Sequence, residues 1–168
     1  MSYTTRFRLA DDFIAHVDTI ITAIHDPFII SRQIGFVVLS AVTVYELAIK
    51  DILFDFADKK HRVLSTFTRA YFEQLNGRIK LATIRDDYLP RFGDKYVARF
   101  RKHLAHAEKD TLQSKHLSIM NCYANVIQWR HDFVHQGITP TNATYNEAKI
   151  SFEIGKEAIH CLAKSMTR

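Results

Sequence analysis

The sequence predicts an all-α fold, a bundle of about five to seven helices that forms one domain over residues 1–168. Apolar residues recur at spacings of three and four along nearly the whole chain, and no segment of useful length alternates apolar and polar residues. Only three prolines and five glycines interrupt the 168 residues. A chain of this length buries a core without disulfides or metals, so we interpret Cys122 and Cys161 as core residues in a reducing, cytoplasmic compartment.

The sequence also argues against a membrane protein. Charged residues from Arg6 to Asp12 leave no apolar segment of the kind found in a signal peptide. The longest apolar run, residues 34–53, is interrupted by polar residues every three or four positions, which indicates a buried helix rather than a membrane span. The net charge of +5 is compatible with a polyanionic partner but is too small to identify one.

Two helices are expected at the start of the chain. The inner face of the first is predicted to consist of Leu9, Phe13, Val17, Ile20 and Ile24. Asp26 and Pro27 then provide an N-cap and a first-turn proline for a second helix over residues 28–57. This helix is the most apolar and is expected to be central. Its few polar groups form a single line, namely Ser40, Thr43, Glu46 and Lys50.

The middle of the chain is expected to hold three further helical segments. The first presents Leu64, Phe67, Tyr71 and Leu75 on one face and ends near Asn76-Gly77. A shorter piece over residues 79–88 is closed by Pro90 and the Phe92-Gly93 turn. The third buries Tyr96, Phe100, Leu104 and Ala107, and its opposite stripe consists of Lys95, Arg99, Lys102 and His106. This stripe is either a solvated face or a track for RNA phosphates, in which case Lys95, Arg99 and Lys102 are the RNA-binding candidates.

The last two helices flank a loop that contains Thr139-Pro140. The first of them is predicted over residues 111–134. Thr144 and Glu147 have the spacing of a capping box, which predicts the start of the final helix. Its inner face is expected to consist of Ala148, Phe152, Ile159, Leu162 and Met166.

Residues 129–137 contain several ionisable side chains, which a helix that only fills a core does not need. At about 100° per residue, Arg130 falls inside an apolar arc. That arc consists of Ile119, Met120, Tyr123, Val126, Ile127, Phe133 and Val134. The opposite, polar line consists of Asn121, Asn125, Gln128, Asp132 and His135. A guanidinium in an apolar arc is costly unless it is paired or faces water. Arg130 therefore either extends to solvent, pairs with an acid such as Glu46, or is held at a cleft to meet a phosphate.

The spacing of these residues limits how they can meet. His131 and His135 are four apart and share one face of a helix. Arg130 and His135 are five apart, so they point about 140° away from each other on a regular α-helix. They converge only if the helix loosens before Gly137, or if the same helix of a second copy faces the first across a two-fold axis.

Arg130, His131 and His135 together match the Rx4-6H motif, so the chain resembles HEPN domains. The long apolar second helix, the glycine after the motif histidine and the helix that follows the Thr-Pro loop are similar to the RiboL-PSP-HEPN branch. The resemblance implies a bundle that dimerises through the motif helix and a metal-independent endoribonuclease site, without a cofactor, at the dimer seam. Arg130 and His135 would take the catalytic positions and His131 the polar one.

The resemblance also bears on partners. It implies an RNA substrate and extends to a toxin or antiviral defence effector with an antitoxin or defence-system partner. Members that act with a nucleotidyltransferase antitoxin carry a tyrosine two residues after the motif histidine. Gly137 stands there in this chain, so regulation through that tyrosine is not expected.

These residue types suit RNA cleavage without a metal. An imidazole takes and gives protons near neutral pH, and an arginine offers two parallel hydrogen bonds to phosphoryl oxygens. We therefore predict that His135 transfers protons, that Arg130 contacts the phosphate and that His131 orients or shares the proton transfer. Glu46 and Asp132 are the supporting candidates.

Two other functions remain open from the sequence. A non-catalytic dimerisation or RNA-binding module would use the same helices. A di-metal carboxylate bundle could use Glu157 with His160, and Asp132 with His135, because both pairs have the spacing of carboxylate and imidazole ligands.

Overall fold

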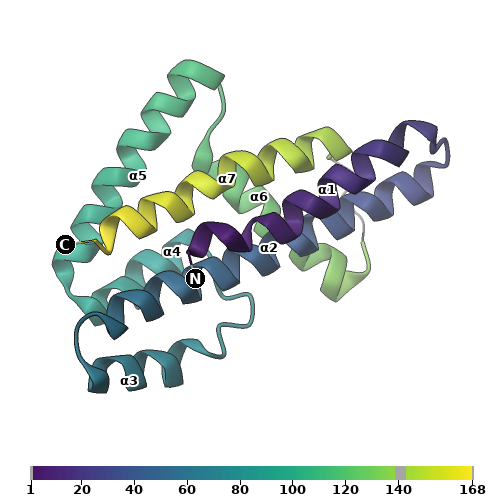
Figure 1. The fold of residues 1–168 in the computed structure, drawn as a ribbon. Helices are drawn as coiled ribbons and strands as arrows, with labels where there is room; N and C mark the ends of the chain where they lie inside the picture. The colour runs from purple at the N-terminus through teal and green to yellow at the C-terminus, as the bar shows by residue number, and fades with distance from the viewer. Residues whose placement is uncertain (1, 139–142, 168) are drawn as a thin grey trace.

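Helix α2 (Pro27–Asp58) forms the axis against which the other helices pack (Figure 1). The computed structural model describes residues 2–138 and 143–167, and within these ranges it contains α-helices, short 3-10 and π segments and no strand. The prediction of an all-α bundle is confirmed. The Thr139-Pro140 part of the predicted loop between the last two helices lies outside the described residues.

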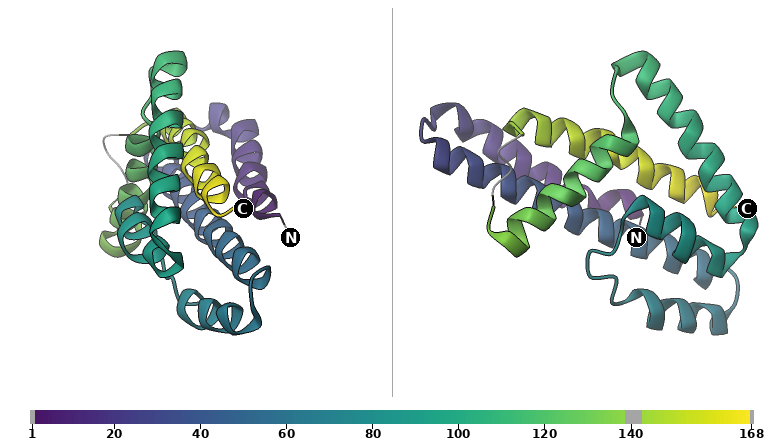
Figure 2. Two further views of the ribbon diagram at one scale, coloured as in Figure 1. Left: turned by 90° about the vertical axis from the view of Figure 1, so that its left-hand side faces the viewer. Right: turned by 180° about the vertical axis from the view of Figure 1, so that it is seen from behind.

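The remaining elements follow in chain order, starting with a 3-10 turn at Tyr3–Arg6. They are α1 (Arg8–Ile20), a 3-10 turn (Ile21–Ala23), α2, α3 (Arg62–Phe72), α4 (Leu81–Thr83), a π turn (Ile84–Tyr88), a 3-10 turn (Leu89–Phe92), α5 (Asp94–Lys115), α6 (Ile119–His131), a π turn (Asp132–Gln136) and α7 (Tyr145–Ser165). Helix α7 packs against α6, α2 and α5, and α1 lies along α2. The far end of α5 projects beyond the bundle in each view (Figures 1 and 2).

The caps predicted for α2 and α7 are confirmed. The Asp26 carboxylate accepts a hydrogen bond from the Phe28 amide at 2.8 Å, and Pro27 opens α2. Thr144 and Glu147 form the capping box, since each side chain accepts a hydrogen bond from the other residue's backbone amide. Such caps satisfy amide groups that the first turn of a helix leaves unpaired.

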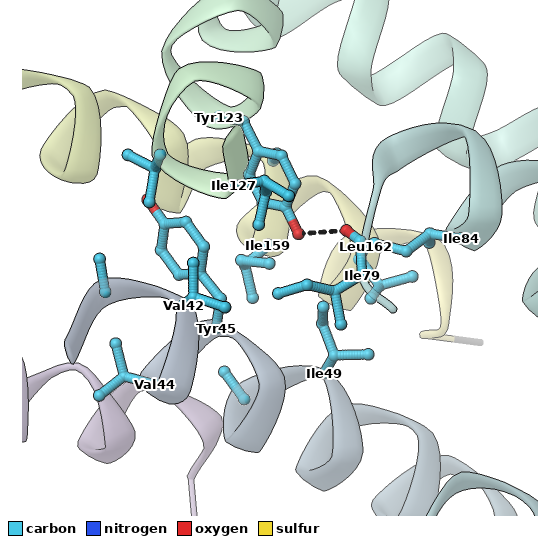
Figure 3. Close-up of a cluster of buried hydrophobic side chains, with 14 of the residues drawn as sticks. Val42, Val44, Tyr45, Ile49, Ile79, Ile84, Tyr123, Ile127, Ile159 and Leu162 are labelled. Carbon is cyan, nitrogen blue, oxygen red and sulfur yellow. Dashed lines mark hydrogen bonds between the residues drawn. The ribbon is translucent and has the colours of Figure 1, made fainter. Parts of the chain in front are cut away.

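The core is rich in aromatic and β-branched side chains from α2, α6 and α7 (Figure 3). The rings of Tyr45 and Tyr123 stack with centroids 5.2 Å apart, and both residues are fully buried. The Tyr45 hydroxyl donates to the Phe152 carbonyl at 2.5 Å, and the Tyr123 hydroxyl donates to the Ile79 carbonyl at 2.7 Å. Burial raises the pKa of both phenols, so they stay protonated and keep donating.

The predicted inner faces of α1 and α3 are partly wrong. In α1 the buried residues are Ala10, Ile14 and Val17, whereas Leu9 is 62% exposed. In α3, Phe72 is buried, whereas Phe67 is 72% exposed. In both helices a neighbouring line of residues faces inward, which includes Ala10 and Thr68; these two residues are 0% and 3% exposed.

The predicted helix over residues 111–134 is wrong at its start. Thr111 belongs to α5, which ends where His116 adopts a left-handed conformation with φ 56°. Ser118 then caps α6 by accepting a hydrogen bond from the Asn121 amide at 3.1 Å. The nearly buried Glu108 accepts from both the Ser118 hydroxyl and the Met120 amide, at 2.5 and 3.1 Å. This carboxylate fixes the corner between α5 and α6, which the apolar periodicity alone does not reveal.

No helix within the described ranges is both long enough and apolar enough to cross a membrane.

Candidate functional site

The guanidinium of Arg130 lies against the loop between α3 and α4. The space that a side chain would occupy at Gly77 is 3.5 Å from Arg130 Nη1 and 3.8 Å from Nη2, so the cation covers the bare glycine backbone. Gly77 has φ +76°, a conformation that side-chain-bearing residues rarely adopt. Position 77 therefore requires glycine for its positive φ, and the guanidinium packs in van der Waals contact beside it.

Three side chains from separate elements hold this loop at consecutive residues. The Gly77 amide donates to Glu46 Oε2 at 2.7 Å. The Arg78 carbonyl accepts from the Tyr88 hydroxyl at 2.5 Å. The Ile79 carbonyl accepts from Tyr123, the bond drawn as a dashed line in Figure 3. We call residues 76–79 the arginine-support loop.

Glu46 supports Arg130 indirectly, not as the counter-charge considered from the sequence. Its Oε1 pairs with Lys50 Nζ at 2.9 Å, one turn further along α2, while its Oε2 holds the Gly77 amide. Among the described residues no carboxylate lies within ion-pairing distance of Arg130. The Arg130 charge is thus left available for an anion.

Arg130 Nε is buried and has no hydrogen-bond partner among the described residues. A buried donor left unpaired costs about 1–3 kcal/mol, so such groups are rare in proteins and often mark a functional site. The Arg130 side chain as a whole is only partly buried. A ligand with oxygen acceptors can therefore reach the guanidinium.

Directly after Arg130 the helix changes its winding. Residues Asp132–Gln136 form a π turn, and the amides of Gly137 and Ile138 both donate to the Asp132 carbonyl. Gly137 closes the turn in the left-handed conformation at φ 66°. The helix thus loosens before Gly137, one of the two arrangements that the sequence allowed. A π turn adds about one residue to a helical turn, which reduces the angle between residues five apart; such turns are frequent at functional sites.

The end of α6 and the π turn each present one histidine to solvent. His131 and His135 are both exposed, and their ring centroids lie 4.8 Å apart. Asp132, the other supporting candidate, accepts a hydrogen bond from Gln128 Nε2 at 2.8 Å. The structure therefore brings the two imidazoles together. Within the described part of the chain, no hydrogen bond joins Arg130 to either of them.

Phe133 fastens the π turn to α2. Its ring occupies the space that a side chain at Gly35 would need, and it meets the Phe36 ring edge-on at 5.8 Å. The Arg32 guanidinium lies 5.9 Å from the centre of the Phe133 ring. This contact places the two histidines relative to the bundle.

Replacing Gly35 with alanine is expected to displace Phe133, because the new methyl group would lie closer than 3.0 Å to the ring. Overpacking of this kind costs about 1–3 kcal/mol. We expect a lower unfolding free energy in urea and altered NMR resonances of His131 and His135. Thr43→Ala, an exposed change on the same helix, serves as the control. Unchanged histidine resonances in Gly35→Ala would refute this role of the contact.

The three candidates for RNA binding on α5 lie away from the motif. The first half of α5 lies beside the end of α2, where Tyr96 contacts Phe56, whereas the π turn after α6 lies near the start of α2, where Phe133 packs at Gly35 (Figures 1 and 2). Lys95, Arg99 and Lys102 are all exposed, as predicted for a solvated stripe. Arg99 also donates to the Thr167 carbonyl at 2.8 Å, which engages part of its hydrogen-bonding capacity. Within one copy these residues do not extend the site around Arg130.

The residues considered for metal binding are not assembled as ligands. Within the described residues there is no group of three or more His, Cys, Asp or Glu side chains placed to hold an ion. His160 Nδ1 instead forms a hydrogen bond with the Tyr3 hydroxyl at 2.8 Å. Burial lowers the pKa of His160 and favours its neutral form.

Two features of the site were not predicted from the sequence. The pairing of the arginine-support loop with Arg130 joins residues more than fifty positions apart, and no local pattern encodes it. The Asn76-Gly77 pair was interpreted only as a helix end, although two successive residues of this kind can signal a backbone with positive φ.

The family model described as RiboL-PSP-HEPN matches residues 2–168. No curated protein and no solved structure matches the chain.

Proposed function

Because the chain belongs to the RiboL-PSP-HEPN family, we propose that it is a metal-independent endoribonuclease that cleaves RNA by attack of the 2′-hydroxyl. The observation that carries this proposal is the environment of the Arg130 side chain. Its guanidinium sits at the surface of a packed loop, without a carboxylate partner among the described residues and with a buried, unpaired Nε. Two exposed imidazoles follow within five residues.

Each residue has a distinct part in the proposed reaction. The 2′-oxygen forms a bond to phosphorus while the bond from phosphorus to the 5′-oxygen of the next nucleotide breaks. His135 transfers the protons that the 2′-oxygen loses and the 5′-oxygen gains. His131, whose ring centroid lies 4.8 Å from that of His135, orients the His135 ring or shares the proton transfer. Arg130 donates to the phosphoryl oxygens as negative charge builds up on them. The product carries a 2′,3′-cyclic phosphate.

We propose further that two copies complete the site. Apolar side chains are exposed around the π turn: Phe28, Ile29, Phe36, Val134 and Ile138. Phe36 contacts the Phe133 ring, and Arg32 lies over both Phe28 and Phe133, so much of this surface is continuous. An exposed apolar surface beside polar, functional groups is typical of a protein–protein interface. A homodimer through the motif end would bury it and place the imidazoles of one copy near Arg130 of the other.

The proposal includes a cellular setting. Cys122 and Cys161 are both buried and unpaired, as expected in a reducing cytoplasm. A ribonuclease in this setting must be restrained, which fits a toxin or antiviral defence effector held by an antitoxin or another component of a defence system.

The test is cleavage of single-stranded RNA by protein prepared in the presence of a chelator. We expect shortened RNA whose new ends carry a 2′,3′-cyclic phosphate, detected by mass spectrometry. A non-catalytic module would retard RNA in a gel without shortening it, and its affinity would fall with increasing salt. Cleavage that depends on added divalent metal would contradict the proposed mechanism.

A further inference from the structure

A cavity lies between the end of the arginine-support loop and α6. Its volume is about 400 Å³, within the range of small-ligand sites. Its walls include the aliphatic side chains of Leu81, Ala124 and Ile127 and the polar side chains of Lys80, Asn125 and Gln128. The cavity is thus lined by apolar side chains, two side-chain amides and one cation.

The position of this cavity relates it to Arg130. One wall is α6, where Gln128 stands two residues, or about 3 Å along the axis, before Arg130. The other wall begins at Lys80, three residues after the Gly77 on which the guanidinium rests. Both walls belong to elements that also carry or contact Arg130, whereas Asn125 and Gln128 project from the side of α6 away from it. An RNA strand with one phosphate at Arg130 would pass over the loop at Lys80 to reach the cavity.

The polar groups of the cavity are free to bind a ligand. The Asn125 side chain is exposed and makes no hydrogen bond within residues 2–138 and 143–167, so its amide offers both donors and an acceptor. Gln128 uses its Nε2 to donate to Asp132, which leaves Oε1 as an acceptor. Amide side chains of this kind form paired hydrogen bonds with base edges.

The adjoining loop supplies positive charge. Arg78 and Lys80 are both exposed and have no ion-pair partner among the described residues. They lie on either side of the anchored Ile79, so their backbone positions are fixed by the Tyr123 and Tyr88 hydrogen bonds. Cations on a rigid loop are suited to the phosphates of a single RNA strand.

We propose that this cavity is a nucleobase subsite. It binds a base of the same strand whose phosphate lies at Arg130, Asn125 contacts the base edge, and Lys80 binds that nucleotide's own phosphate. The inference rests on the proposed function, since it assigns the binding path of the same RNA. It replaces the α5 stripe as the main RNA contact within one copy.

The test measures binding separately from cleavage. In a His135→Ala background, the affinities for four fluorescent single-stranded RNAs, one for each base, are compared by anisotropy. Lys80→Ala is expected to weaken binding about tenfold for all four and to lower the salt slope by about 0.7. Asn125→Ala is expected to change the ratio between the best and worst bases by about 5-fold or more.

The matched control is Lys102→Ala, which removes the same charge from the exposed stripe of α5. We expect it to change affinity less than twofold. The subsite is overturned if Lys80→Ala weakens binding no more than this control, or if Asn125→Ala leaves the base ratios unchanged. Circular dichroism checks that both variants keep their helices.

The outcomes separate this inference from the proposed function. If the wild-type protein does not cut RNA but Lys80→Ala and Asn125→Ala act as expected, the subsite stands and the nuclease proposal fails. If RNA is cut and the two variants bind normally, the subsite alone is wrong. If no RNA binds to the His135→Ala protein, the subsite is also wrong.

Discussion

Replacing either Arg130 or His135 with alanine is expected to lower the rate of RNA cleavage by about 10²–10⁴-fold, because each change removes a group that acts only as the phosphate reacts. Neither change should unfold the protein. His135 is exposed, and Arg130 makes no ion pair among the described residues that its removal would break. Single-turnover rates measured at saturating protein would separate loss of chemistry from loss of binding.

Three further variants sharpen this prediction. Arg130→Lys keeps the charge but loses the paired hydrogen bonds, so it should retain only a small part of the activity. His106→Ala and Arg62→Ala remove exposed groups of the same types far from the motif and should cleave normally. Normal cleavage by Arg130→Ala or by His135→Ala would remove that residue from the proposed mechanism.

Mixing the two inactive proteins tests whether the site is shared between copies. After exchange, half of the dimers contain one copy of each variant. If Arg130 of one copy works with His135 of the other, one of the two sites in such a dimer is intact, so about a quarter of all sites should regain activity. Sites contained within a single copy would regain none.

The largest loss of stability is expected from Gly155→Ala on α7. A methyl group there would lie closer than 3.0 Å to the Tyr45 hydroxyl, and also 3.5 Å from the Tyr123 Cα. Tyr45 is fully buried and has little space to move. The change would strain the core and disturb the hydrogen bond from Tyr45 to Phe152, at a cost of about 2–4 kcal/mol. Urea unfolding followed by circular dichroism measures this loss.

A double-mutant cycle shows whether the Tyr45 hydroxyl causes the loss. Tyr45→Phe removes the atom nearest the added methyl group. Gly155→Ala should therefore cost less in the Tyr45→Phe background than in the wild type, with a coupling of about 1 kcal/mol. Lys164→Ala, an exposed change on the same helix, should leave stability nearly unchanged. Additive losses from Tyr45→Phe and Gly155→Ala would contradict the contact.

Local signals in the sequence predict the helices well where the cap and the periodicity agree. Asp26-Pro27 and the Thr144–Glu147 pair each mark a helix start that the structure confirms. The corner at His116 could not be predicted, because residues 111–134 keep a helical period through it. A carboxylate from another turn of α5, Glu108, fixes that corner, and such tertiary contacts override local propensity.

The sequence proposed residue types for the candidate site but could not give their geometry. The anomalous position of Arg130 in an apolar arc indicated a cation at a cleft, and the four-residue spacing of His131 and His135 indicated adjacent rings. Which loop would support Arg130 depends on how α2, α6 and the segment after α3 pack together. The sequence therefore left Glu46 as one possible partner of the guanidinium, whereas in the structure it binds the Gly77 amide.

The three anchors of residues 76–79 also bear on the energetics of the proposed RNA binding. Glu46, Tyr88 and Tyr123 reach this short segment from three different parts of the bundle. A loop tethered in this way has already lost its backbone freedom when the protein folds. An RNA strand that binds at Arg130 would then not need to order this loop. More of the free energy of its contacts would therefore appear as affinity.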